Sequence, residues 1–297
     1  MPPVYHAAVK ILFSPECAGY RVPSHPDSPR RVTATATLLR QKPGYEFIAA
    51  QPCDEADILR VHTPRLLEEV RRGESGDPHT PAIPGIFEHA RLSAGAAIQA
   101  ATLAWRGTPA FSLMRPPGHH ACRDRLMGFC YFNNMAIALA RLLQTGGGPK
   151  RVAIVDFDCH HGNGTEEIFR GCNEVLCVSL HQSPAYPGTG LRPEGNALNF
   201  PLPPATDGPR YLETFDRALE AVRGFRPELL GVEAGFDAYK RDPLTDMGLE
   251  IETFVEIGRR LAALRLPMFA LLEGGYSSRL PKCVAAFLDG WEPGQPA

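Results

Sequence analysis

The 297-residue sequence has no excess of charge of either sign, because 31 basic and 33 acidic residues give a formal net charge of −2. A basic face for nucleic acid or for an anionic membrane surface is therefore not indicated. No apolar run approaches the roughly 20 residues that span a bilayer. The opening stretch, MPPVYHAAVKILF, contains His6 and Lys10, and its apolar run is too short for a signal peptide. We therefore expect a cytoplasmic protein without nucleic-acid or membrane partners.

The eight cysteines show no regular disulfide framework, and Cys130, Cys159 and Cys177 lie in or beside core-like or site-like segments. In a chain of this length such cysteines are expected to be reduced thiols. The 29 prolines and 28 glycines cluster between apolar runs, which indicates many ordered loops. A hydrophobic content of 44% is enough for one large core, so we expect a single domain over 1–297 with a loose tail from about 291.

Apolar runs of strand length alternate along the chain with segments of helical periodicity. The expected strands cover 10–13, 46–49, 110–114, 152–155, 175–180, 229–233 and 268–272. The expected helices cover 29–41, 54–60, 64–72, 86–106, 133–144, 165–169, 212–222, 251–264 and 280–288. Alternating strands and helices require crossover connections. The pattern therefore predicts an α/β fold with a mostly parallel sheet that has helices on both faces.

The segment 152–165, VAIVDFDCHHGNGT, combines a buried strand with a group of metal-ligand residue types. Asp156, Asp158 and His160 occupy alternate positions, which share one side of an extended backbone. Carboxylates and imidazoles are ligands for Zn²⁺ or a similar divalent ion. The segment therefore predicts a metal site at the end of a strand.

A plainer interpretation of this segment is a helix-capping aspartate next to core histidines. Capping needs one acid, whereas DFDCHHGNG supplies two acids and two imidazoles, so we favour the metal site. Gly162 and Gly164 favour a tight turn into a helix that begins near Thr165.

Polar residues also follow the other strands of the second half of the chain. They are His119 and His120 after 110–114, Ser179 and His181 at the end of 175–180, Asp237 after 229–233, and Tyr276 after 268–272. In an open parallel sheet, ligands bind at the carboxyl ends of the strands. These separate segments are therefore expected to form one site at one edge of the sheet.

Six motifs occur in the order RPPGHHA, DFDCHHGNGT, VSLH, PGTG, AGFDAYKRDPL and EGGY. In this order they resemble the zinc-dependent histone deacetylase superfamily, which includes bacterial deacetylases and acetylpolyamine amidohydrolases. The resemblance runs from His25, in SHPDSPRR, to Tyr276. It implies an arginase/deacetylase-like fold and hydrolysis of an acyl amide, such as an N-ε-acetyl-lysine, at a metal centre.

The resemblance assigns a role to each residue that matches a family motif. Asp158, His160 and Asp237 match the three ligands of Zn²⁺, with Fe²⁺ as the other candidate. Three protein ligands leave a position open for water and substrate. The matching catalytic residues are His120 as general base, His119 as its partner imidazole held by Asp156, Asn163 beside the base, and Tyr276 as hydrogen-bond donor to the substrate carbonyl.

A structural K⁺ ion is also implied by the resemblance. Its matching ligands are the Ser179 hydroxyl and the backbone carbonyls of Asp156, Asp158, His160 and Leu180. The alternative is that Ser179 only caps the end of a strand.

A narrow substrate tunnel is the third implied feature. Gly128 and Phe129 match one wall, Tyr186 is expected on the opposite wall, and Gly274 and Leu244 complete the assignment. Facing aromatic rings would bury an aliphatic stem such as that of lysine. Tyr186 taken alone is equally well explained as an ordinary loop aromatic.

Three positions depart from the commonest family pattern. Asn163 replaces an aspartate found in many members, so it can orient His120 but supplies no full charge. Either His79 or Asp77 could take the place of a rim aspartate that binds the substrate backbone. Leu244 stands where polyamine-preferring relatives carry a glutamate, and an apolar side chain does not attract a second ammonium. Acetyl-lysine is therefore favoured over acetylpolyamines.

Three other functions remain open at the level of sequence. One is an amidohydrolase of the same fold acting on acetylpolyamines or other small acyl amines. Another is a non-catalytic acyl-lysine binding module, which the intact His120, Tyr276 and ligand set disfavour. A third is an arginase-like ureohydrolase, which needs two Mn²⁺ ions and more aspartate ligands. The sequence does not indicate an oligomeric state.

Overall fold

The computed structural model describes residues 8–291, and these contain one eight-stranded sheet in which all paired strands run parallel. The strand order is β2-β1-β3-β8-β7-β4-β5-β6. The strands are β1 (Val9–Phe13), β2 (Tyr45–Ala49), β3 (Ala110–Ser112), β4 (Val152–Asp156), β5 (Val175–Gln182), β6 (Ala197–Leu202), β7 (Leu229–Ala234) and β8 (Met268–Leu272). The predicted α/β fold is confirmed, and the expected tail after 291 lies outside the described residues.

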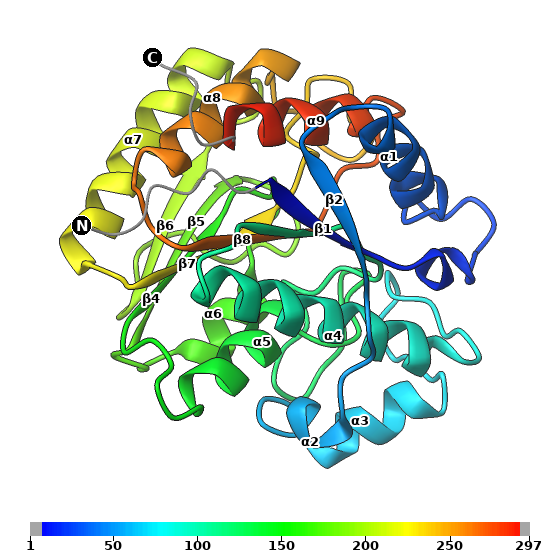
Figure 1. Ribbon diagram of the computed structural model, residues 1–297. Coiled ribbons are helices and arrows are strands. Elements are labelled where there is room, and N and C mark those ends of the chain that lie inside the picture. The colour runs from blue at the N-terminus through cyan, green and yellow to red at the C-terminus, as the bar shows by residue number, and fades with distance from the viewer. Residues whose placement is uncertain (1–7, 292–297) are drawn as a thin grey trace.

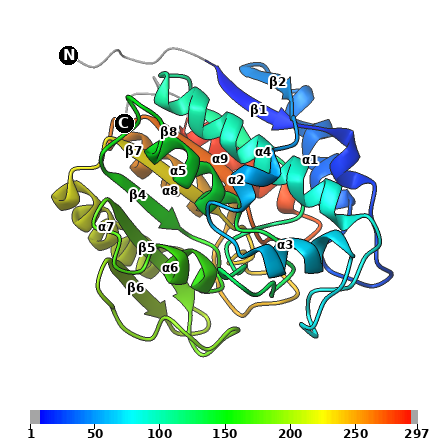
Figure 2. The same cartoon turned by 90° about the horizontal axis from the view of Figure 1, so that it is seen from below.

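Helices cover both faces of the sheet, as Figure 1 shows. On one face are α1 (Arg30–Arg40), α7 (Gly208–Phe225), α8 (Ile251–Ala262) and α9 (Leu280–Trp291). On the other face are α2 (Glu55–Ile58), α3 (Pro64–Arg71), α4 (Ile86–Trp105), α5 (Asn134–Leu143) and α6 (Asn163–Phe169). Figure 2 shows α4, α5 and α6 from below, across the strands that they cover. A short 3-10 helix, Pro15–Ala18, follows β1.

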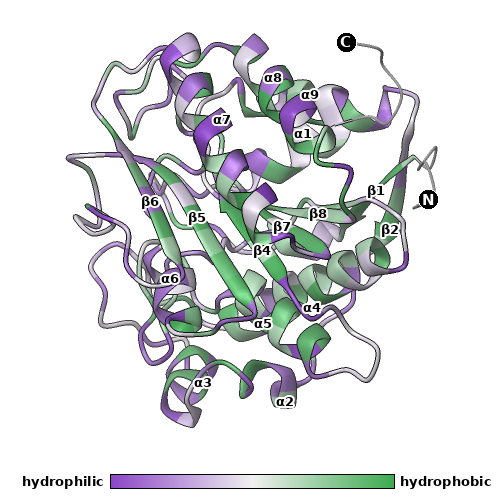
Figure 3. Ribbon diagram, turned by 90° about the vertical axis from the view of Figure 1, so that its left-hand side faces the viewer, coloured by the Kyte–Doolittle hydropathy of each residue, from purple (hydrophilic) through white to green (hydrophobic). Residues whose placement is uncertain are grey.

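The central strands carry the hydrophobic core. Every residue of β4, β5, β7 and β8 is buried, because helices lie on both faces of these strands. Figure 3 shows β4 and β5 as mainly hydrophobic ribbons between helices of mixed hydropathy. Strands of this kind have continuous apolar runs, which is why the sequence pattern located them.

Strand β6 was not predicted, since Pro201 interrupts its sequence. It lies at the edge of the sheet, where β5 is its one neighbouring strand within residues 8–291, and a proline is tolerated at such an edge. Strand β5 runs to Gln182 and not to 180, so His181 lies within the strand. The expectation that His181 follows the strand end is therefore wrong.

Gly162 forms the predicted tight turn before α6: its φ of −73° and ψ of 59°, with the 2.8 Å hydrogen bond from Asn163 N to the His161 carbonyl oxygen, are those of an inverse γ-turn. Gly162 and Gly164 also serve close packing. Helix α6 begins at Asn163, and Gly164 lies inside it. A Cβ at Gly164 would be 2.3 Å from the Ala121 carbonyl oxygen, and one at Gly162 would be 2.2 Å from Asp156 Oδ2. Both contacts are shorter than atoms tolerate, so these two positions admit no side chain.

All eight cysteines lie among the described residues and are free thiols. Within 8–291, no helix is long and apolar enough to cross a membrane.

Helix α4 packs against the segment after β2 so closely that Gly95 has no room for a methyl group. A Cβ there would be 1.9 Å from the Gln51 carbonyl oxygen and 2.6 Å from the Cys53 nitrogen. Gly95→Ala should therefore lower the free energy of unfolding by about 2–3 kcal/mol, measured by urea denaturation. The control is Gly224→Ala in α7, where the added Cβ meets nothing within 4 Å. That variant should be unchanged or stabilised by up to about 1 kcal/mol, and equal effects of the two substitutions would contradict the packing.

Candidate active site

Asp158, His160 and Asp237 meet at the carboxyl ends of β4 and β7. One ligand atom from each residue lies within 4.8 Å of the others. His160 Nδ1 is 2.9 Å from Asp237 Oδ2 and 3.2 Å from Asp158 Oδ1. Atoms this close can share one divalent ion at the roughly 2.0–2.2 Å typical of Zn²⁺ with oxygen and nitrogen ligands. The ligand set predicted from the sequence is thus brought together.

Hydrogen bonds from backbone N–H groups to the aspartate side chains place these ligands. The alternation of side chains along an extended strand does not. Strand β4 ends at Asp156, and the chain bends over the next residues. Asp156 Oδ1 accepts a hydrogen bond from Asp158 N at 2.9 Å, and Asp158 Oδ1 accepts one from His160 N at 2.9 Å. Asp237 Oδ1 accepts one from Cys159 N at 2.8 Å. The predicted proximity is present, but the reason given for it, an extended backbone through His160, is wrong.

The electrostatic field of this group favours a cation. Burial opposes a charged His160, but Asp237 and Asp158 outweigh that effect and raise its pKa well above the usual value. Both carboxylates are fully buried, and burial followed by repulsion from Asp158 raises the pKa of Asp237. A bound divalent ion would relieve this repulsion, so the residues fit Zn²⁺ or Fe²⁺.

A pair of buried imidazoles lies beside the ligand group. His119 Nδ1 is 3.0 Å from Asp156 Oδ2, and His120 Nδ1 is 2.8 Å from Asn163 Oδ1. The two rings are 4.0 Å apart between centroids. Burial, then the neighbouring His119 and His160, lower the pKa of His120 well below its usual value. His120 is therefore neutral at pH 7 and able to accept a proton.

The phenol of Tyr276 lies on the segment after β8. Its ring is 5.7 Å from that of Phe129 and packs edge-on against it. Burial raises the pKa of Tyr276 well above its usual value, so the hydroxyl keeps its proton and can donate a hydrogen bond. A protonated phenol is the form needed to stabilise a developing oxyanion.

Four of the predicted tunnel residues, Gly128, Phe129, Tyr186 and Gly274, lie close to His120, Tyr276 or the ligand carboxylates. Gly128 and Phe129 both have positive φ, 58° and 70°, and a Cβ at Gly128 would be 2.4 Å from His120 Cδ2. The Tyr186 ring is 5.2 Å from His120, on a different loop from Phe129. Gly274 lies directly over the ligand carboxylates, where a Cβ would be 2.4 Å from Asp237 Oδ2.

The two rim candidates differ in the predicted tunnel residue that each contacts. Asp77 Oδ2 accepts a hydrogen bond from Gly128 N at 3.3 Å, while the exposed His79 ring lies 5.3 Å from Tyr186. Leu244 is 40% exposed. Asp77 is thus hydrogen-bonded to one predicted wall residue, Gly128, whereas the His79 ring contacts the other, Tyr186.

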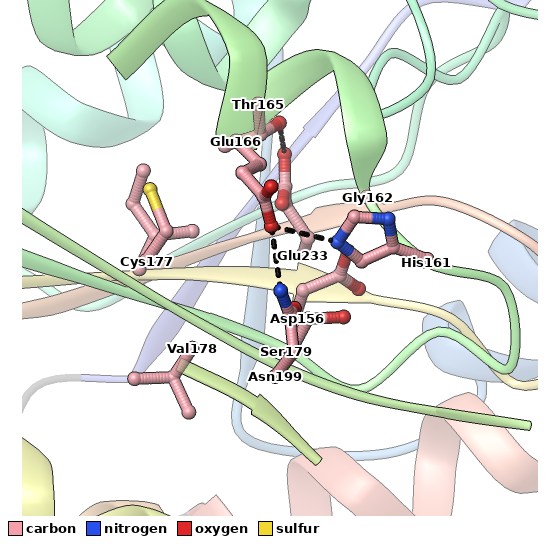
Figure 4. Close-up of a pocket in the computed structure, with 11 residues that line it drawn as sticks. Asp156, His161, Gly162, Thr165, Glu166, Cys177, Val178, Ser179, Asn199 and Glu233 are labelled. Atoms are coloured by element: carbon pink, nitrogen blue, oxygen red, sulfur yellow. Dashed lines mark hydrogen bonds and ion pairs between the residues drawn. The ribbon is translucent and has the colours of Figure 1, made fainter. Parts of the chain in front are cut away.

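A small cavity lies between α6 and the strands β4, β5 and β7. Its volume is about 10 Å³, and Figure 4 shows Asp156, Ser179 and Glu233 among its lining. Glu233 Oε1 accepts a hydrogen bond from Thr165 at 2.6 Å, while Oε2 is buried with no hydrogen-bond partner among the described residues. A space of this size is at the lower limit for one water molecule, at roughly 10–15 Å³.

Of the predicted K⁺ ligands, Asp156 and Ser179 line this cavity, whereas Asp158, His160 and Leu180 do not. Ser179 Oγ also lies 2.9 Å from His181 Nδ1. His181 Nε2 in turn contacts the Gly190 carbonyl oxygen at 3.0 Å, so His181 holds the loop after β5 and does not join the metal ligands.

Sequence reasoning missed the groups that hold Tyr276. Arg31 Nε donates to the Gly275 carbonyl oxygen at 2.7 Å, and Asp27 Oδ1 accepts from both Arg31 and Arg115 at 2.8 Å. Burial opposes ionisation of Asp27, but Arg115 and Arg31 outweigh it and lower its pKa to about 2. Asp27 and Arg31 belong to the quoted SHPDSPRR motif, so the signal was present without an assigned role.

Comparison with known protein families assigns residues 25–291 to the histone deacetylase domain family, and the chain therefore belongs to that family. A probable deacetylase of Archaeoglobus fulgidus is 39% identical over 86% of this chain and 77% of the relative. A histone deacetylase-like amidohydrolase of Pseudomonas aeruginosa is 37% identical over 93% of this chain and 77% of the relative.

Solved structures show the same fold. The crystal structure of the HDA15 HD domain matches with a TM-score of 0.88 at 31% identity, covering 95% of this chain and 88% of that one. Acetylpolyamine aminohydrolase from Burkholderia pseudomallei matches with a TM-score of 0.85 at 29% identity, covering 95% and 98%. The protein is thus an amidohydrolase of the histone deacetylase fold, from a family that is generally metal-dependent.

Metal retention tests the ligand group directly. Asp158→Ala and Asp237→Ala should each lose the bound ion, because the remaining two ligands cannot hold it against dialysis. Elemental analysis of the purified variants measures the metal per chain. Asp77→Ala serves as the control, since this carboxylate contacts Gly128 and lies outside the ligand group. Full metal content in either ligand variant would contradict the assignment.

Proposed function

We propose that this protein is a metal-dependent deacylase that hydrolyses the acyl amide of N-ε-acyl-lysine, with acetyl as the acyl group. The observation that supports it best is one arrangement of side chains: a cation-favouring ligand group, a neutral buried imidazole and a protonated phenol at one edge of the sheet. Asp158, His160 and Asp237 are the proposed ligands of Zn²⁺, with Fe²⁺ as the alternative. When bound, the metal polarises the acyl carbonyl and acidifies water.

Residues of the chain accept and donate the protons in this proposed reaction. His120 accepts a proton from the attacking water and later returns one to the leaving amine, while Asn163 fixes the orientation of its ring. Asp156 holds His119, so that imidazole stays in place beside His120. The Tyr276 hydroxyl donates a hydrogen bond to the carbonyl oxygen as negative charge develops there.

The substrate proposal depends on the tunnel and its rim. Phe129 and Tyr186 offer aromatic faces on two loops beside His120 and Tyr276, and such faces bury the methylenes of lysine. Asp77, fixed to Gly128, is available to the backbone N–H groups of a peptide. The exposed Leu244 offers no charge to a second ammonium, which favours acyl-lysine over acetylpolyamine. Acetylpolyamines and other small acyl amines are the second candidate class, because relatives carry that name as well.

A structural K⁺ ion is a further proposal, and two alternative functions can be weighed against the deacylase. We propose that a structural K⁺ ion binds the Ser179 hydroxyl together with the backbone carbonyls of Asp156, Asp158, His160 and Leu180, which lie at the ends of β4 and β5. An arginase-like reaction would need two metal ions, and the described residues offer one group of three ligands. A non-catalytic binding module would keep the tunnel but show no turnover, so an activity measurement separates it from an enzyme.

His120→Ala should abolish turnover while leaving the metal bound, because His120 is the proposed base and lies outside the ligand group. We expect a loss of about 100- to 10,000-fold in kcat on an acetyl-lysine peptide, with metal content equal to that of the wild type. Near-normal activity would show that another group accepts the proton.

The choice of amine is tested by steady-state assays of an acetyl-lysine peptide against acetylputrescine and acetylspermidine. The wild type should prefer the peptide, and Leu244→Glu should raise kcat/KM for acetylspermidine about tenfold through attraction of its free ammonium. Leu191→Glu is the matched control, since Leu191 is 64% exposed on the loop after β5. A preference of the wild type for acetylpolyamines by orders of magnitude would refute the substrate proposal.

A further inference from the structure

The carboxylate of Asp242 joins the two segments that follow β7 and β8. Its side chain is almost completely buried, with the residue 7% exposed. Oδ2 accepts hydrogen bonds from the backbone N–H groups of Tyr276, at 2.7 Å, and Ser277, at 3.0 Å. Oδ1 accepts one from Leu244 N at 3.1 Å. One side chain therefore binds the backbone of Tyr276 and that of Leu244 at once.

The rest of the Tyr276 segment is held from other directions. Gly274 N donates to Asp158 Oδ2 at 2.6 Å, which ties the segment to a metal ligand. Arg31 Nε donates to the Gly275 carbonyl oxygen at 2.7 Å, and its guanidinium carbon lies 4.8 Å from the centre of the Tyr276 ring. Asp242 is thus the only side chain among the described residues that binds the N–H of Tyr276 itself.

We propose that Asp242 is a positioning residue for catalysis: it fixes the backbone from which the Tyr276 phenol reaches the substrate carbonyl. The proposal rests on the proposed deacylase function. Both Asp242 oxygens accept backbone N–H groups, so an amide, whose nitrogen is a donor, cannot take its place without losing at least one of these contacts. The phenol must come within about 2.7–3.1 Å of the oxyanion, and a displacement of about 1 Å can cost roughly 100-fold in rate.

A double-mutant cycle with Tyr276→Phe tests whether Asp242→Asn lowers kcat through the Tyr276 hydroxyl or through a general disturbance of the active-site structure. Asp242→Asn should lower kcat about 10- to 100-fold with little change in KM, and Tyr276→Phe about 100- to 1000-fold. If Asp242 acts through the phenol, Asp242→Asn should change kcat by less than about threefold in the Tyr276→Phe background. Full additivity of the two effects would overturn the proposal.

Two companion variants keep this test interpretable. Asp242→Glu retains the carboxylate and should recover part of the lost kcat, which a merely structural role would not predict. Asp246→Asn is the matched control, because Asp246 is an exposed aspartate on the same segment, and it should behave as the wild type. If Asp242→Asn does not fold, the cycle is measured with Asp242→Glu.

Hydrogen exchange measures the positioning without any substrate. In Asp242→Asn, or in Asp242→Glu if the first variant does not fold, the amides of Tyr276 and Ser277 should exchange faster than in the wild type and in Asp246→Asn. A peptide containing Asp158 and His160 should be unchanged. Unaltered exchange at 276 and 277 would overturn the proposal. A wild type that hydrolyses no acyl amine would refute the proposed function, while this exchange measurement would still decide the role of Asp242.

Discussion

Two buried carboxylates facing one imidazole are the constraint on which the rest of this structure depends. Asp158 and Asp237 are fully buried, and both contact His160 Nδ1. Isolated charges in such a place would be strongly unfavourable, so they need a cation and a dense set of backbone donors. The N–H groups of Cys159, His160 and Gly274 supply those donors. The ligand loop and the Tyr276 segment therefore fold around the same pair of charges.

The parallel sheet brings these polar groups together, because the carboxyl ends of its strands lie at the same edge. His120, Asp158, His160, Asp237 and Tyr276 all lie beyond the carboxyl end of a buried strand, where the backbone leaves the sheet and its N–H groups can bind side chains. Glycines complete the arrangement by close approach. Gly128, Gly162 and Gly274 each lie where a Cβ would strike His120, Asp156 or Asp237.

Much of the fold could be predicted from sequence because β4, β5, β7 and β8 are continuous apolar runs buried on both faces. Edge strand β6 could not, since an edge needs no such run and tolerates Pro201. Polar residues that are costly to bury marked the strand ends, and the resemblance to the deacetylase motifs then assigned Asp158, His160 and Asp237 as the ligands. The supporting groups, Asp27, Arg31 and Asp242, were not, because their role depends on contacts between distant segments that no local pattern encodes.

The most direct test is a crystal structure of the protein grown with Zn²⁺, with anomalous diffraction recorded on both sides of the zinc absorption edge. A single strong anomalous peak between His160 Nδ1 and carboxylate oxygens of Asp158 and Asp237, with His120 and Tyr276 facing it, is the predicted result. A peak elsewhere, or two adjacent peaks bridged by carboxylates, would contradict the metal centre described here.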